Sequence, residues 1–426
     1  MSSFKFIHAA DLHIESPYRG LRRLNNELGD ALVKQGLKAY ERLINTCIDE
    51  QVDFLLIAGD SFDSDSGSLS AQYRFIRGLE NLKRENIPVY MICGNHDPLD
   101  NWSEHLNLPD NVVRFSGEEV QQHTVIKGDK SLAEIYGISY QKKEEYRNLA
   151  EKFKRKDKSP FAIGMLHGTL TGRHTLSPYC PFDMDSLRKA GMDYWALGHI
   201  HKREIVSDQN PAIVYSGNIQ GRHFNETGEK GCSLVEVKDG KIQAHNFVPL
   251  SEIIFDYRKI DVSGLKNLGD FFTLTDEIKA ELEATKSCHL LRIELTGASE
   301  LNNVFARKSE MEDLVKELNA GNDYHQPFVF YDQIINHTIP VIDLEERMKS
   351  SDFIADLLQR FDKYGKDLNA LIDLKNELLE EMSSTKVGRQ LNSEDFSEEL
   401  HKELEDLLNS AKWKCMEGLT KQDDTE

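Results

Sequence analysis

The sequence has few of the features that mark membrane, secreted or disulfide-rich proteins. No apolar run reaches the roughly 18 residues that a membrane span needs. The start, MSSFKFIHAADLHI, has no basic segment followed by an apolar signal core, which argues against secretion. The six cysteines lie far apart with no CxxC pair, so we expect reduced thiols and neither a disulfide framework nor a zinc ribbon. These absences predict a cytoplasmic protein with no membrane partner.

The chain also has no excess of basic charge. It contains 52 Lys and Arg residues against 72 Asp and Glu residues, a formal net charge of −20. Proteins that bind nucleic acid usually present a basic surface, so this total argues against such a partner. However, residues 1–250 hold 31 basic and 34 acidic side chains, and the rest of the excess lies in residues 251–426. The first part is nearly neutral, and DNA stays open as its substrate.

The 426 residues are enough for two or three domains. Residues 1–252 alternate short apolar runs with amphipathic stretches, which predicts an α/β domain with helices near residues 32–51 and 70–85. Residues 253–342 show the order strand, helix, strand, helix, strand, and predict a small α+β domain. Residues 343–426 predict a helical segment.

Metal-binding residue types follow five expected strand ends in the first domain. They are Asp11-Leu12-His13, Gly59-Asp60, Gly94-Asn95-His96-Asp97, His167 and Gly198-His199-Ile200-His201. The carboxyl ends of strands in α/β layers converge on one crevice, so distant residues can meet there. Taken alone, D-x-H, Gly-Asp and His167 are better explained by an ordinary turn or a core histidine, whereas G-N-H-D and G-H-I-H are stronger signals, because imidazoles directly after apolar runs have little structural purpose. It is the ordered set that predicts a site.

Without Asp97, this set holds two aspartates, one asparagine and five histidines. Such a mixture suits Mn²⁺, Fe²⁺ or Zn²⁺ better than Ca²⁺ or Mg²⁺, which prefer oxygen ligands alone. It has too many ligands for one tetrahedral zinc, whereas two ions that share a bridging carboxylate fit the count. Such a pair can clamp a phosphoryl group and activate a bridging water, which predicts phosphoester hydrolysis.

The order D-x-H, G-D, G-N-H-D, H, G-H-x-H resembles the calcineurin-like metallophosphoesterase superfamily over residues 4–250. The phrases HAADLHIESP, AGDSFDSD, GNHDP, LGHIH and YSGNIQGRHFNETGEKG resemble its DNA repair exonuclease branch, with SbcD-type nuclease subunits and YhaO-like proteins. This resemblance implies a two-sheet β-sandwich flanked by helices, with residues 253–342 as a capping domain. It implies hydrolysis of DNA phosphodiester bonds by a hydroxide held between two ions, with Mn²⁺ expected and Fe²⁺ or Zn²⁺ as alternatives.

The resemblance also assigns roles to residues. One ion would be held by Asp11, His13, Asp60 and His201, and the other by Asp60, Asn95, His167 and His199. His96 matches a position that binds no metal, and is expected to protonate the leaving oxygen or stabilise the transition state. Either Asp97 or Asp63 could orient His96. Asp63 departs from archaeal and eukaryotic relatives, which have a histidine there, but bacterial members commonly carry an aspartate.

Five further residues next to the expected crevice are candidates for holding substrate phosphates. They are Arg173, His174, Arg203, Arg222 and His223. The alternative for each of them is ordinary solvated surface charge.

The C-terminal segment shows apolar positions at helical spacing between residues 354 and 379, and a second helix is expected near residues 396–413. These helices either pack on their own domain or, as the resemblance implies, dock on the coiled coil of an SMC-like (SbcC-type) ATPase subunit. A homodimer is implied by the resemblance alone. Two other functions stay open, namely hydrolysis of nucleotides or small phosphodiesters, and a non-enzymatic, metal-stabilised scaffold for an ATPase.

Overall fold

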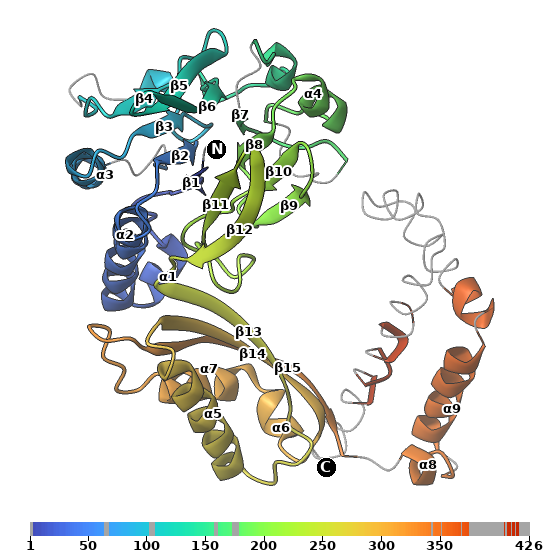
Figure 1. Ribbon diagram of the computed structural model, residues 1–426. Coiled ribbons are helices and arrows are strands. Elements are labelled where there is room, and N and C mark those ends of the chain that lie inside the picture. Colours follow the sequence, from blue (N-terminus) through green and yellow to red (C-terminus); the bar gives the residue numbers. More distant parts are fainter. Residues whose placement is uncertain are drawn as a thin grey trace. The chain divides into compact units, whose positions relative to one another are not determined.

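The structure, a computed structural model, describes residues 3–374 except 64–67, 102–106, 157–160, 173–178, 342–343, 351 and 368; beyond these it describes only residues 404, 407–409, 411–413 and 415–416 (Figure 1). The chain divides into two compact units. The first comprises Met1–Lys259, Phe272–Glu294 and Glu312–Ile335, and the second comprises Ile260–Phe271, Leu295–Met311 and Asn336–Glu426. The three-domain division at residues 252 and 342 stays a prediction.

The first large sheet has the strand order β12-β11-β1-β2-β3-β4. Its parallel part contains β1 (Ser3–Ala9), β2 (Phe54–Ala58), β3 (Val89–Ile92) and β4 (Val112–Arg114). The antiparallel strands β11 (Gly231–Lys238) and β12 (Lys241–Pro249) complete it. The carboxyl ends of β1, β2 and β3 therefore lie at one edge, where three of the predicted motifs follow.

The second large sheet has the order β5-β6-β7-β8-β10-β9. Its parallel part contains β6 (Lys130–Gly137), β7 (Ala162–His167), β8 (Tyr194–Gly198) and β10 (Ala212–Tyr215). The antiparallel strands β5 (Gln121–Lys127) and β9 (Glu204–Ser207) form its edges. The other two predicted motifs follow the neighbouring parallel strands β7 and β8.

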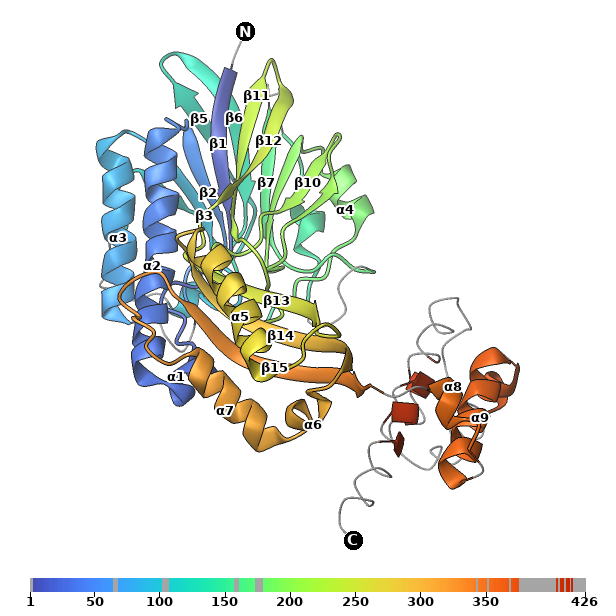
Figure 2. The same ribbon diagram turned by 90° about the horizontal axis from the view of Figure 1, so that it is seen from below.

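The two sheets bury a shared apolar core in which aromatic residues such as Phe6, Phe54 and Tyr194 interlock. The outer face of the first sheet packs against α2 (Asn26–Asp49) and α3 (Leu69–Arg84), which lie side by side in Figure 2. The outer face of the second packs against α4 (Met184–Lys189) and η2 (Leu149–Lys152). This arrangement confirms the predicted two-sheet sandwich flanked by helices. The remaining short elements here are α1 (Arg19–Leu24) and η1 (Leu99–Asn101).

A third sheet has the order β13-β14-β15. Its strands are β13 (Ile253–Asp261), β14 (Cys288–Ser299) and β15 (Val329–Pro340), and the intervening helices are α5 (Leu268–Glu283), α6 (Asn302–Phe305) and α7 (Lys308–Leu318). The order strand, helix, strand, helix, strand is thus confirmed. Helices α8 (Leu344–Arg347) and α9 (Phe353–Lys366) follow. The helix predicted near residues 396–413 lies mostly outside the described residues. In the described part of the chain, no helix combines the length and apolarity that a membrane crossing needs.

Candidate metal centre

The motif residues of both large sheets meet at the carboxyl ends of their strands. The backbone amide of His199, after β8, donates to both carboxylate oxygens of Asp11, after β1, at 3.1 Å. The ring Nδ1 of His167, at the end of β7, lies 2.9 Å from the carbonyl oxygen of Ala58, at the end of β2. The predicted convergence of strand ends therefore occurs across the two sheets.

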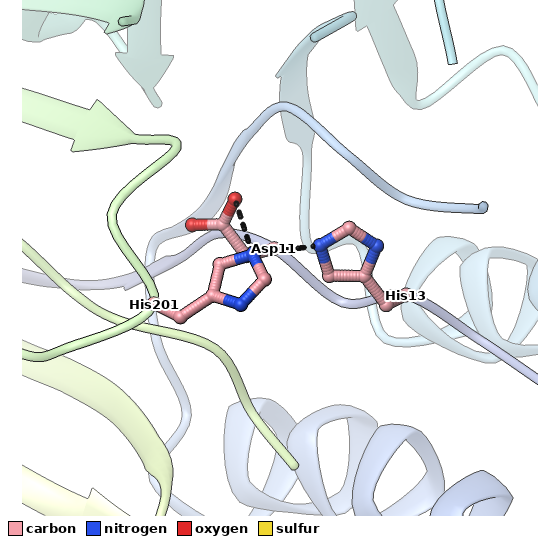
Figure 3. Close-up of side chains that lie close together, drawn as sticks. All are labelled: Asp11, His13 and His201. Atoms are coloured by element: carbon pink, nitrogen blue, oxygen red, sulfur yellow. Dashed lines mark hydrogen bonds and ion pairs between the residues drawn. The ribbon is translucent and has the colours of Figure 1, made fainter. Parts of the chain in front are cut away.

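Asp11, His13 and His201 form one group whose ligand atoms all lie within 4.8 Å of one another (Figure 3). The Nε2 atoms of His13 and His201 are 3.0 Å apart, and Asp11 Oδ1 lies 4.0 Å from His201 Nε2. These residues are three of the four ligands predicted for the first ion.

The hydrogen bonds behind the two imidazoles indicate what this group can bind. Nδ1 of His13 lies 2.7 Å from Asp63 Oδ1, and Nδ1 of His201 lies 2.6 Å from Glu226 Oε1. A carboxylate accepts the Nδ1 proton, so in neutral rings both Nε2 atoms point lone pairs at each other. A proton on His201, whose pKa is raised, or a cation in its place relieves that repulsion. A carboxylate behind a metal-binding histidine is a usual arrangement. The donor set therefore fits a divalent ion.

A second group contains Asp11, Asp60 and His167, all fully buried. Nε2 of His167 lies 3.4 Å from Asp60 Oδ2 and 3.1 Å from Asn95 Oδ1. The Nδ1 atom of His199 lies 3.1 Å from the same Asn95 oxygen. Asp60 Oδ2 also lies 3.8 Å from His13 Nε2 in the first group, so this carboxylate faces both groups. The structure thus brings together all seven predicted ligands, whose metal-binding role stays a prediction.

Burial and neighbouring charges set the protonation of the cluster. Burial lowers the pKa of His13 to about 4 and that of His199 to about 3, so both rings are neutral at pH 7 and can offer lone pairs. Burial opposes the charge of Asp60, but the charge and hydrogen bond of His167 outweigh it and lower the pKa of this carboxyl. Burial likewise opposes protonation of His167, but Asp60 raises the pKa of His167 to about 9.

Several motif residues have a strained backbone, and two glycines have no room for a side chain. Asp11, His13, Asp60 and His199 have φ values of 51°, 40°, 53° and 94°. Non-glycine residues seldom adopt positive φ, and each costs on the order of 1–3 kcal/mol, which folds tend to retain at functional sites. A Cβ on Gly94 would lie 2.2 Å from Asp60 Oδ1, and one on Gly59 2.4 Å from His167 Nδ1. The glycines therefore allow the close approach of the ligands.

His96 lies beside the cluster and belongs to a third group, with His13 and Asp63. Its Nδ1 is 3.4 Å from Asp63 Oδ1, and 34% of its side chain is exposed. Asp97 instead accepts hydrogen bonds from the backbone amides of Asp60, Ser61 and Gly94. Of the two carboxylates predicted to orient His96, Asp63 is therefore the one that faces its ring, and Asp97 holds the turns.

The predicted phosphate contacts are placed in different surroundings. Arg222 donates to Asp63 Oδ2 at 2.7 Å, and His223 Nε2 lies 3.1 Å from Glu226 Oε1. Both thus lie next to the cluster. Arg203 instead lies over the ring of Phe247 in β12, 5.4 Å from its centroid. Arg173 and His174 lie outside the described residues.

Glu226 is a site residue that the sequence motifs did not predict. Besides His201 it accepts from Asn218 Nδ2 and from the backbone amide of Arg222, both at 2.8 Å. Burial would raise its pKa, but the hydrogen bond and charge of His201 lower the pKa of Glu226 to about 2. No spacing rule ties it to His201, because it follows that residue by 25 positions in a loop. It holds the His201 ring as Asp63 holds that of His13.

Glu226→Gln is expected to weaken metal binding, because the amide removes the negative charge that fixes and polarises His201. Loss of such a carboxylate behind a metal ligand costs about 10–100-fold in metal affinity. Titration of the metal-free protein with Mn²⁺ measures the change, with exposed Glu229→Gln as the matched control. Equal affinities of the two variants would contradict the role given to Glu226.

Comparison with known proteins found one matching family and, among others, two similar relatives. The sequence profile of a family described as calcineurin-like phosphoesterase matches residues 4–203. The chain is 37% identical over 330 residues to a protein of Bacillus subtilis called uncharacterized metallophosphoesterase YhaO, covering 78% of this chain and 81% of the relative. It is 26% identical over 382 residues to the DNA double-strand break repair protein Mre11 of Sulfolobus acidocaldarius, covering 86% and 94%.

Proposed function

Because the chain belongs to the calcineurin-like phosphoesterase family and is a hydrolase, we propose that it is a metal-dependent exonuclease that cleaves phosphodiester bonds in DNA. The observation that carries this proposal is the position of His96, a partly exposed imidazole beside a buried cluster of carboxylates and histidines. A scaffold needs no proton donor at that place. The similarity to a DNA double-strand break repair protein over most of the chain supports DNA as the substrate.

Two divalent ions at the cluster would polarise the phosphoryl group and supply a nucleophile at neutral pH. Asp60 faces both groups of ligands, so it would hold the two ions at a fixed separation. Burial lowers the pKa of His96, and the negative charge of a bound phosphodiester would counteract this, since an opposite charge stabilises an imidazolium. Asp63 faces Nδ1 of that ring, so Nε2–H is the donor left for the leaving oxygen.

The experiment that tests this function is an assay of the purified protein with Mn²⁺ on linear, nicked and circular duplex DNA. Progressive shortening of the linear duplex, with the closed circle left intact, is the expected result. Cleavage of small phosphodiesters without any cleavage of DNA would show that the substrate is a nucleotide or another small diester. No hydrolysis of either class would favour the scaffold.

We further propose Mn²⁺ as the ion, and expect its binding to stabilise the fold in a pH-dependent way. Histidines must be neutral to bind a metal. The pKa of His167 is about 9 and that of His201 is raised, so both must lose protons on binding, and affinity rises with pH. A free Mn²⁺ concentration of about 100 times Kd adds roughly 2.7 kcal/mol to the free energy of unfolding. Thermal unfolding with and without Mn²⁺ at about pH 7.5 and about pH 5.5 measures this, and a larger shift at the acid pH would contradict it.

We propose an SMC-like ATPase as the partner of the C-terminal segment. We also propose that the protein is cytoplasmic and forms a homodimer. Helix α9 begins with Phe353, whose side chain is among the exposed large hydrophobic ones, whereas Ala355 and Leu358 are buried. The free cysteines agree with a reducing compartment. Co-purification of the ATPase with the full chain, and its loss on deletion of residues 343–426, is expected. Unchanged capture would show that the segment does not hold this partner.

A further inference from the structure

A groove of about 530 Å³ lies beside the candidate metal centre, within one compact unit of the chain. We call it the arginine groove. It is lined by Tyr18 and Arg19 at the start of α1, Arg222 and Phe224 after β10, Arg292 of β14 and Asp332 of β15, among others. Its volume lies in the range of about 300–1,000 Å³ that is typical of ligand sites.

The arginine groove is joined to the metal centre by direct contacts. Arg222 lines the groove and donates to Asp63 Oδ2 at 2.7 Å, while the other oxygen of Asp63 is bound to His13 Nδ1. The backbone amide of Arg222 is bound to Glu226, the carboxylate behind His201. A strand whose phosphodiester reaches the cluster therefore has the groove as its neighbouring surface.

The charge of the groove is opposite to that of the chain. Three arginines line it against one acidic residue, Asp332, and Arg222 is also paired with Asp63 outside the lining, whereas the whole chain has a net charge of −20. Guanidinium groups recognise phosphates through paired hydrogen bonds. The groove is thus suited to an anionic ligand.

Arg292 is held in a fixed position within the groove. Its guanidinium carbon lies 3.9 Å from the centroid of the Phe224 ring, and its Nε donates to Asp332 Oδ2 at 2.6 Å. Within the described residues, no hydrogen bond engages its two terminal nitrogens. Stacking on Phe224 and pairing with Asp332 reduce the conformational entropy that Arg292 would lose on binding. Its terminal nitrogens are therefore preorganised to bind a phosphate.

We propose that the arginine groove binds the sugar–phosphate backbone of the nucleic-acid strand adjacent to the bond that is cut, with Arg292 and Arg19 each contacting one phosphate. This inference rests on the proposed nuclease function. It means that the preference for DNA over small phosphodiesters comes from a surface outside the metal ligands. Small diesters do not reach the groove, so their cleavage should not depend on it.

The test uses a fluorescent oligonucleotide with phosphorothioate linkages, bound to the full chain with Mn²⁺ at several salt concentrations. Arg19→Ala and Arg292→Gln should each weaken binding about tenfold, as a lost charged hydrogen bond does. Each should also reduce the slope of log K against log salt by roughly 0.7–0.9. Arg23→Ala, which removes the same charge from α1 outside the groove lining, is the matched control and should retain affinity. Hydrolysis of bis(p-nitrophenyl) phosphate should be unchanged in all three variants.

Two results would overturn the inference while leaving the nuclease function intact. In the first, Arg19→Ala and Arg292→Gln both bind the oligonucleotide with wild-type affinity and wild-type salt dependence, and the protein still cuts DNA. The other is an equal loss in Arg23→Ala, which would show a general effect of charge. A wild-type protein that cleaves the small diester but neither binds nor cuts DNA would instead overturn the nuclease function together with the groove. Because Arg19 is exposed, its variant remains informative even if Arg292→Gln does not fold.

Discussion

His96→Ala is expected to abolish DNA hydrolysis while the protein keeps its metal ions. The imidazole lies beside the ligand cluster, with Nδ1 3.4 Å from Asp63 and about a third of its side chain exposed, so it can reach a leaving oxygen. Its loss removes proton transfer in the transition state, which is worth roughly 10²–10⁴-fold in rate. The predicted ligand set remains complete, because none of the seven residues is changed.

Single-turnover cleavage of linear duplex and metal analysis of the same preparation measure the two parts of this prediction. His123→Ala in β5 is the matched control, since that ring packs edge-on against Phe115 and lies in an edge strand of the second large sheet, whereas His96 follows β3 of the first. A His96→Ala protein that cuts DNA at the wild-type rate would show that its imidazole takes no part in proton transfer. A protein that loses its metals would instead make His96 a ligand or its support.

Asp60→Asn is expected to reduce metal content from two ions to one or none, and to lower activity strongly. Asp60 is 1% exposed, and its Oδ2 faces His167 of one group and His13 of the other. The amide keeps the shape but loses the charge that would offset two cations. Metal ions supply several kcal/mol of transition-state stabilisation, so their loss costs roughly 10³-fold or more.

Metal content per chain and the rate of cleavage at saturating Mn²⁺ are the two measurements. The control is Asp53→Asn, which changes a buried carboxylate just before β2, at the other end of the strand that Asp60 follows. It should destabilise the fold without affecting either measurement. Two bound ions in Asp60→Asn would contradict the bridging role.

Local sequence patterns predicted most of the fold because they depend on neighbouring residues. The expected helix at residues 70–85 is α3, which begins after the Ser68 cap and spans Leu69–Arg84. The helix expected at 32–51 is α2, but it begins at Asn26, because the side chain of Asn25 accepts from the amide of Leu28 and caps it. Gly29 within its first turns weakens the helical pattern before residue 32, which explains the late predicted start.

The sequence by itself determined which residue types end each strand, since an apolar run followed by aspartate, asparagine or histidine is a local feature. Only the tertiary structure decided which carboxylates stand behind the imidazoles. Asp63 lies 50 residues from His13, and Glu226 lies 25 residues from His201. Arg292 meets Phe224 and Asp332 only through the packing of β14, β15 and the loop after β10. Hydrogen bonds between such distant groups leave no periodic pattern, because the folded chain and not the spacing brings their atoms together.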